Sequence, residues 1–135
     1  IEMGIQPFLL TSTIIAIVSQ RLVRCICPNC REEYQPDEEV LKSIKLAPGK
    51  VKFYKGKGCA SCVSTGYKGR MAIHEVLMMN DEIRHKIFEG HSTEEIKRAA
   101  RMSGMKTMRY DGLAKAAQGI TTLSEVIRMT KTDEQ

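Results

Sequence analysis

The sequence predicts an α+β fold, mostly helical, in which a small β module is followed by a C-terminal helical bundle. Three observations predict it: two C-x-x-C pairs, short alternating stretches around them, and three glycines that each end a helical pattern after residue 79. The 135 residues allow one domain or two small ones. With no Trp, three Phe and four Tyr, the chain has few large core residues and is a candidate for a metal or covalent staple.

The strongest pattern is the pair of C-x-x-C motifs, Cys27 with Cys30 and Cys59 with Cys62, separated by 28 residues (31–58). Two thiolates of one motif reach the same Zn²⁺ at about 2.3 Å, and a second motif completes a tetrahedron. The separation exceeds the roughly 15–20 residues of the common template, but loop length costs little free energy. We therefore predict that these four cysteines hold a structural zinc ion that clips the β module. Four thiolates leave no open position at which the metal could run a reaction.

Other uses of the cysteines stay open. Two disulfides would need an oxidising compartment, and nothing in the sequence indicates secretion. A redox site of the thioredoxin type begins a helix, whereas Pro28 and Pro36 make a poor helical context. Free buried thiols are a further alternative. Cys25 is the odd thiol: we take it as free or partly buried, with replacement of Cys27 as a ligand as the alternative.

The first half of the chain predicts few elements. Residues 7–24 are predicted to form one helix. The apolar run 8–18 is too short for a membrane span, which needs about 20 residues, so it is interpreted as part of a buried helix. Asp37 is expected to cap a short helix. Alternating residues predict strands at 51–54 and from about residue 70 to 76.

From Asn80 onward the pattern is helical. Asn80 is expected to cap the first helix, and the next begins with a capping box of Ser92 and Glu95. A second capping box is predicted at Thr122 and Glu125. The predicted helix ends are Gly90, Gly104 and Gly119. The resulting boundaries are residues 1–24, 25–78 and 79–135.

The charge and the missing motifs limit the function. The formal net charge of +5 fits a nucleic acid, an anionic membrane face or an acidic neighbour. The chain has no G-x-x-x-x-G-K-[ST] loop, no dinucleotide fingerprint and no nucleophile with an adjacent base. No catalytic and no cofactor-binding residues are therefore predicted, and the chain alone is expected to be non-catalytic.

Three stretches in order resemble the C-terminal end of the type II secretion and type IV pilus assembly ATPase family. They are residues 3–30, 58–77 and 111–130, and they carry "QRLVR" (20–24), both cysteine pairs, "GYKGR" (66–70) and "GITT" (119–122). By this resemblance the four cysteines fall on the family's tetracysteine zinc site. Residues 1–24 would then be the end of the ATPase core, 25–78 the zinc-binding module and 79–135 a C-terminal helical subdomain.

The resemblance implies a full-length parent that is a cytoplasmic homo-hexamer, peripheral at the bacterial inner membrane. The family's phosphate-binding loop, acidic boxes and histidine box precede residue 1, so ATP and Mg²⁺ belong to the parent. Its expected partners are inner-membrane platform proteins of secretion or pilus assembly, with anionic lipid as a further candidate and no nucleic acid. The resemblance does not distinguish secretion from pilus assembly.

Two functional hypotheses follow. In the first, the zinc module is a rigid arm that passes ATP-driven motion to inner-membrane partners, which it meets through Lys55, Lys57, Lys68 and Arg70. The alternative is a zinc-ribbon nucleic-acid-binding module, which would need exposed aromatic rings for stacking. Its candidate rings are Phe53, Tyr54 and Tyr67.

Overall fold

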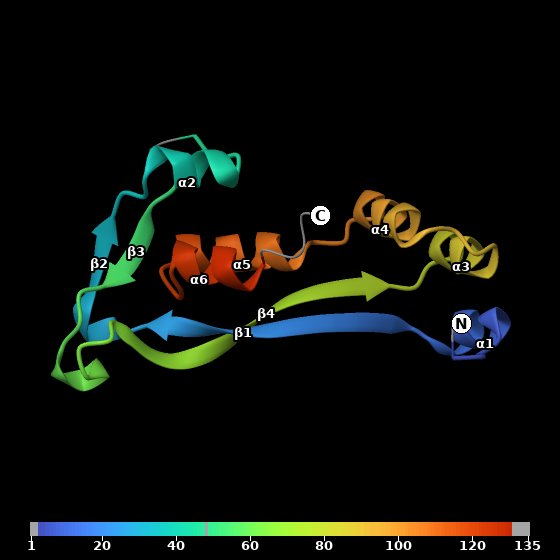
Figure 1. Cartoon of the computed structure of the whole chain (residues 1–135), viewed down its shortest axis with the longest axis horizontal. Coiled ribbons are helices and arrows are strands. Elements are labelled where there is room, and N and C mark those ends of the chain that lie inside the picture. The colour runs from blue at the N-terminus through green and yellow to red at the C-terminus, as the bar shows by residue number, and fades with distance from the viewer. Residues whose placement is uncertain (1–2, 48, 131–135) are drawn as a thin grey trace. The chain divides into compact units, whose positions relative to one another are not determined.

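The computed structural model describes residues 3–47 and 49–130, and its fold is α+β, as predicted (Figure 1). The chain divides into two compact units. The first holds the described residues up to Ser19 together with His74–Thr107, and the second holds Gln20–Ile73 together with the described residues from Met108 onward. Strands β1 (Ala16–Ile26) and β4 (Tyr67–Met78) pair with each other, and each contributes residues to both units.

The first unit contains three short helices. They are α1 (Pro7–Thr13), α3 (Asp81–Phe88) and α4 (Thr93–Met102). Helix α3 contacts both α1 and α4, and its Ile83 is buried together with Ala99 and Ala100 of α4. Among the helices of residues 3–47 and 49–130, none combines the length and the hydrophobicity that crossing a bilayer requires.

The prediction of one helix over residues 7–24 is wrong beyond Thr13, because residues Ala16–Ile26 form strand β1. The last turn of α1 has Thr13 donating its hydroxyl to the Leu9 carbonyl at 2.6 Å, and such side-chain bonds compete with helix formation. The β-branched residues that follow fit a strand, provided that a partner strand is present. Strand β4 is that partner.

The prediction that residues 8–18 are buried is also wrong. Helix α1 has no buried residue, and its Phe8 is 55% exposed. In the following strand Ile17 and Val18 are 50% and 60% exposed. Apolar composition predicted burial, but among the described residues these three side chains stay at least half exposed.

The second unit holds the cysteines. Strands β2 (Arg31–Tyr34) and β3 (Phe53–Gly56) pair antiparallel, with Arg31 opposite Gly56 and Tyr34 opposite Phe53. Helix α2 (Glu38–Ser43) lies between these strands in sequence, and α5 (Met108–Ala117) packs against α6 (Leu123–Met129) and β3. Single 3₁₀ turns, Pro28–Cys30 and Ala60–Cys62, precede β2 and β4.

Two groups of buried side chains hold the second unit together. The first joins α2 and β3 to the last two helices through Leu41, Phe53, Ala116, Leu123 and Val126. The second joins β1, β4 and α5 through Val23, Ile73 and Met108. The ammonium of Lys115 on α5 also donates to the Ala72 carbonyl of β4 at 2.9 Å. The C-terminal helices are thereby fixed to the strands that flank the cysteines.

Most of the predicted helix ends are confirmed. The side chain of Asn80 accepts from the Ile83 N–H at 2.9 Å, and Ser92 and Glu95 form the expected capping box. The three predicted stop glycines, Gly90, Gly104 and Gly119, have positive φ. Asp37 occupies the N-cap of α2, but its side chain makes no capping hydrogen bond.

Candidate metal centre

The structure brings together the four cysteines of the two C-x-x-C motifs. The Sγ atoms of Cys27, Cys30, Cys59 and Cys62 all lie within 4.8 Å of one another. The Cys27–Cys59 sulfur distance is 3.8 Å, the Cys30–Cys62 distance is 3.9 Å and the Cys59–Cys62 distance is 3.7 Å. Thiolates bound tetrahedrally at about 2.3 Å stand about 3.8 Å apart, so the cluster has the size of a tetrathiolate metal site.

Each cysteine pair is held by a single 3₁₀ turn. The N–H of Cys30 donates to the Cys27 carbonyl at 3.3 Å, and the N–H of Cys62 donates to the Cys59 carbonyl at 3.2 Å. After the second turn Val63 and Ser64 have φ of 50° and 58°, a left-handed conformation that disfavours a β-branched residue. This conformation lets the chain reverse immediately after Cys62, so that it returns towards the sulfur.

Backbone N–H groups point at one of the sulfurs. The Sγ of Cys62 accepts from the N–H of Cys59 at 3.2 Å and from the N–H of Gly66 at 3.3 Å. Burial opposes ionisation of this thiol, but these donors together with the side chains of Cys59 and Cys30 outweigh it and lower the pKa of Cys62 to about 6. N–H donors stabilise a thiolate, which is the form that binds a metal.

The two halves of the site meet through glycines. A Cβ atom on Gly56 would lie 2.1 Å from the Gly66 carbonyl oxygen, so no larger residue fits there without a backbone shift. The N–H of Cys27 donates to the same Gly66 carbonyl at 2.9 Å. The end of β3, the first cysteine turn and the segment after the second turn therefore converge at one point beside the sulfurs.

Cys25 lies outside the cluster. It forms an antiparallel bridge with Thr121, and burial raises the pKa of its thiol. In the part of the chain that the structure describes, the four-sulfur group includes Cys27 and omits Cys25. The structure therefore favours Cys27 over the alternative ligand.

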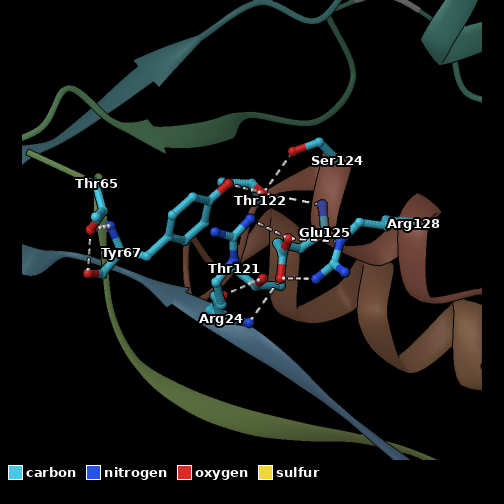
Figure 2. Close-up of polar contacts among 8 residues, drawn as sticks. All are labelled: Arg24, Thr65, Tyr67, Thr121, Thr122, Ser124, Glu125 and Arg128. Atoms are coloured by element: carbon cyan, nitrogen blue, oxygen red, sulfur yellow. Dashed lines mark hydrogen bonds and ion pairs between the residues drawn. The ribbon is translucent and has the colours of Figure 1, made fainter.

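A second polar cluster, which sequence reasoning missed, centres on the buried carboxylate of Glu125 (Figure 2). Its oxygens accept from the Arg24 side chain at 2.7 Å, from the Arg24 backbone N–H at 3.1 Å and from the Arg128 guanidinium at 3.0 and 3.1 Å. Glu125 was predicted to close a capping box with Thr122. Only half of that box forms: Thr122 accepts from the Glu125 N–H at 3.2 Å, while the Glu125 carboxylate turns to the arginines.

The Glu125 cluster adjoins both cysteine-bearing segments. Arg24 lies on β1 three residues before Cys27, and its guanidinium stacks over the Tyr67 ring of β4 at 4.0 Å (Figure 2). The Tyr67 hydroxyl lies 3.1 Å from the Thr122 hydroxyl. The start of α6 is therefore tied to the strand that enters the first cysteine turn and to the strand that leaves the second. The sequence signal for this contact was the polar "TTLSE" run, which local rules explain as a cap.

The aromatic rings proposed for nucleic-acid stacking are not exposed for that role. Phe53 is 2% exposed and belongs to the core. Arg31 lies over the Tyr54 ring at 4.9 Å, and Arg24 lies over the Tyr67 ring. These contacts leave the zinc-ribbon alternative without the stacking platform that it requires.

The comparisons with known proteins identify the family. Residues 1–128 match the family described as "Type II/IV secretion system protein". The chain is 52% identical over 132 residues to the type IV pilus assembly ATPase PilB of Thermus thermophilus, covering 96% of this chain and 15% of that protein. It is 44% identical over 132 residues to the type II secretion system protein E of Dickeya dadantii, covering 96% of this chain and 26% of the relative.

A third relative is the type II secretion system ATPase E of Vibrio cholerae, 40% identical over 133 residues, with 96% of this chain and 26% of that protein covered. The chain thus spans between 15% and 26% of the length of these relatives. The match over nearly the whole chain, together with the four-cysteine cluster, shows that the chain belongs to the type II/IV secretion system protein family.

Proposed function

We propose that this chain is the zinc-stabilised C-terminal portion of an ATPase that powers type II protein secretion or type IV pilus assembly. Its relatives are named as secretion and pilus assembly ATPases, which supports this class of function. In the proposal, the parent is a hexamer at the cytoplasmic side of the inner membrane. Its ATP and Mg²⁺ are bound by parts of the parent outside these 135 residues.

The observation that carries the proposal is the approach of four sulfurs from two segments 28 residues apart. Zinc is the metal that we propose, since four thiolates in a tetrahedron are a donor set typical of structural zinc. Cys27 and Cys30 would hold it from the first segment, and Cys59 and Cys62 from the second. The ion supplies no open coordination position, so its contribution is rigidity, coupled to folding.

The positions of the cysteine turns between strands support the mechanical role that we propose. The first cysteine turn leads into β2, and the second leads into β4. With the ion in place, these strands keep a fixed geometry under load, because separating them would break metal–thiolate bonds. We propose that this rigid arm passes nucleotide-driven motion of the parent to a membrane-associated partner.

The surface that would meet the partner is basic. Lys55 and Lys57 lie 3.7 and 3.0 Å from the single carboxylate of Glu32, so one negative charge is shared by two ammonium groups. Lys68 donates to the Ser61 hydroxyl, a neutral group, at 2.9 Å. Arg70 is the fourth basic residue of this surface. Four positive charges and the one negative charge of Glu32 leave a net charge of +3. Acidic surfaces of platform proteins, or anionic lipid, would be attracted to it.

The test is charge reversal in the full-length parent. Changing Lys55, Lys57, Lys68 and Arg70 together to Glu is expected to weaken secretion or piliation and partner binding while zinc content holds. The matched control reverses four exposed basic residues elsewhere, Lys42, Lys50, Arg98 and Arg101. Unchanged partner binding in the first variant, or an equal loss in both, would reject the proposed contact.

A further inference from the structure

A small pocket in the cysteine-bearing unit has the chemistry of an anion site. It has a volume of about 240 Å³ and is lined by Arg24, Thr65, Tyr67, Gly69 and Arg70. No carboxylate lines it. Gly69 contributes no side chain, and a Cβ built there would meet nothing within 4 Å, so the space above it is open.

One of its two guanidinium groups is held in place. Arg24 stacks over the Tyr67 ring at 4.0 Å and donates to Glu125 at 2.7 Å. That bond uses one of the five N–H donors of a guanidinium. The two pocket hydroxyls already have partners: Thr65 donates to the Cys62 carbonyl at 2.6 Å, and the Tyr67 hydroxyl pairs with Thr122. The unused donors in the pocket are therefore those of arginine.

The charge of the pocket is not neutralised by Glu125. That carboxylate is shared between Arg24 and Arg128, so it cancels one of their two charges. Arg70 is exposed and has no ion pair among the described residues. Three arginines and one glutamate leave a net charge of +2 around the pocket (three minus one).

We propose that this pocket binds a phosphate-class oxyanion between the guanidinium groups of Arg24 and Arg70. The parallel N–H donors of a planar guanidinium match the spacing of phosphate oxygens. A guanidinium already held by stacking, as in Arg24, loses little conformational freedom on binding. The anion has two possible sources, a free phosphate compound or the phosphate of a lipid headgroup. The site does not depend on the motor role proposed above, because it can be tested with the chain alone.

The experiment titrates the metal-loaded 135-residue chain with inorganic phosphate, following the backbone amide signals of Gly69 and Arg70 by nuclear magnetic resonance. A parallel arm measures flotation with vesicles of phosphatidylcholine, with and without phosphatidylglycerol. The test variant is Arg70→Gln, which removes one of the two guanidinium groups of the pocket, at an exposed position without an ion pair among the described residues. The control is Arg101→Gln, the same change at an exposed site on α4.

Saturable phosphate binding that Arg70→Gln weakens about tenfold, and Arg101→Gln leaves unchanged, supports the site and a free phosphate source. Flotation that needs phosphatidylglycerol and Arg70, but not Arg101, supports the site with lipid as the source. The proposal is overturned if neither probe binds saturably, or if both variants weaken binding equally. Equal weakening would mean attraction to overall charge rather than to this pocket.

Discussion

The carboxylate of Glu125 accepts hydrogen bonds from both the backbone N–H and the guanidinium of Arg24, at 3.1 and 2.7 Å, across 101 residues of sequence. Glu125 is 2% exposed, whereas the Arg24 side chain is 50% exposed. A buried carboxylate is stable only when its charge is compensated, and here two arginines and a backbone donor do so. The pair ties α6 to the strand that enters the first cysteine turn.

Replacing Glu125 by Gln should therefore destabilise the second unit. The amide removes the charge and turns donor groups towards the two guanidiniums, at an expected cost of about 2 kcal/mol in the free energy of unfolding. Urea denaturation measures it. The control is Glu38→Gln, which removes an exposed carboxylate 3.8 Å from Lys42 and should cost less than about 0.5 kcal/mol. Equal effects of the two variants would contradict the role of the cluster.

Stability should fall in acid. Burial opposes ionisation of Glu125, but the two arginines outweigh it and lower its pKa to about 2, while hydrogen bonds from Ser92 lower the pKa of Glu95 to about 2. A folded-state pKa below the ordinary value of 4.5 stabilises the protein above that value, and the contribution disappears as pH falls towards 2. Unfolding free energy measured between pH 6 and about pH 2 should decrease, and less steeply in Glu125→Gln. A parallel decrease in that variant would show that other groups dominate.

Metal binding should require four cysteines and not the fifth. Cys27→Ser is expected to lower the metal content of the purified chain, whereas Cys25→Ser should keep one ion per chain, because Cys25 lies outside the sulfur cluster. Native mass spectrometry measures both. In the unmodified chain, a chelator should make thiols reactive that were protected before. Full metal content in Cys27→Ser would disprove the ligand assignment.

Close packing of glycines should be needed beside the sulfurs. In Gly56→Ala the new methyl group would lie 2.1 Å from the Gly66 carbonyl oxygen, which forces the backbone apart. We expect a loss of about 3 kcal/mol in unfolding free energy and weaker metal retention under chelation. Gly90→Ala is the comparison, since its Cβ would meet nothing within 4 Å and only its positive φ of 75° opposes the change. Weaker effects at Gly56 than at Gly90 would refute the steric argument.

Nucleic-acid binding should be weak and unspecific. Phe53 is buried, and arginines lie over the Tyr54 and Tyr67 rings, so the three rings near the cysteines do not form an open stacking platform. A fluorescence titration with a single-stranded oligonucleotide at two salt concentrations measures this. Tight binding with a steep salt dependence would instead revive the zinc-ribbon alternative.

The sequence by itself determined the features that depend on near neighbours. The caps at Asn80 and Ser92 and the glycine ends of the helices are contacts between residues a few positions apart, so a local pattern suffices to predict them. The cysteine spacing likewise predicted which four sulfurs would gather, because a C-x-x-C turn presents both thiols to one point.

Only the tertiary structure decided the use of residues 16–26 and of Glu125. The apolar run before Cys25 suits a helix or a strand, and the pairing with β4 selects the strand by satisfying its backbone groups. Glu125 has the local sequence context of a capping residue. Its carboxylate is buried, however, and a buried charge needs compensating donors, which only the tertiary structure brings into contact with it. Arg24 is 101 residues away, and no local pattern encodes a contact over that distance.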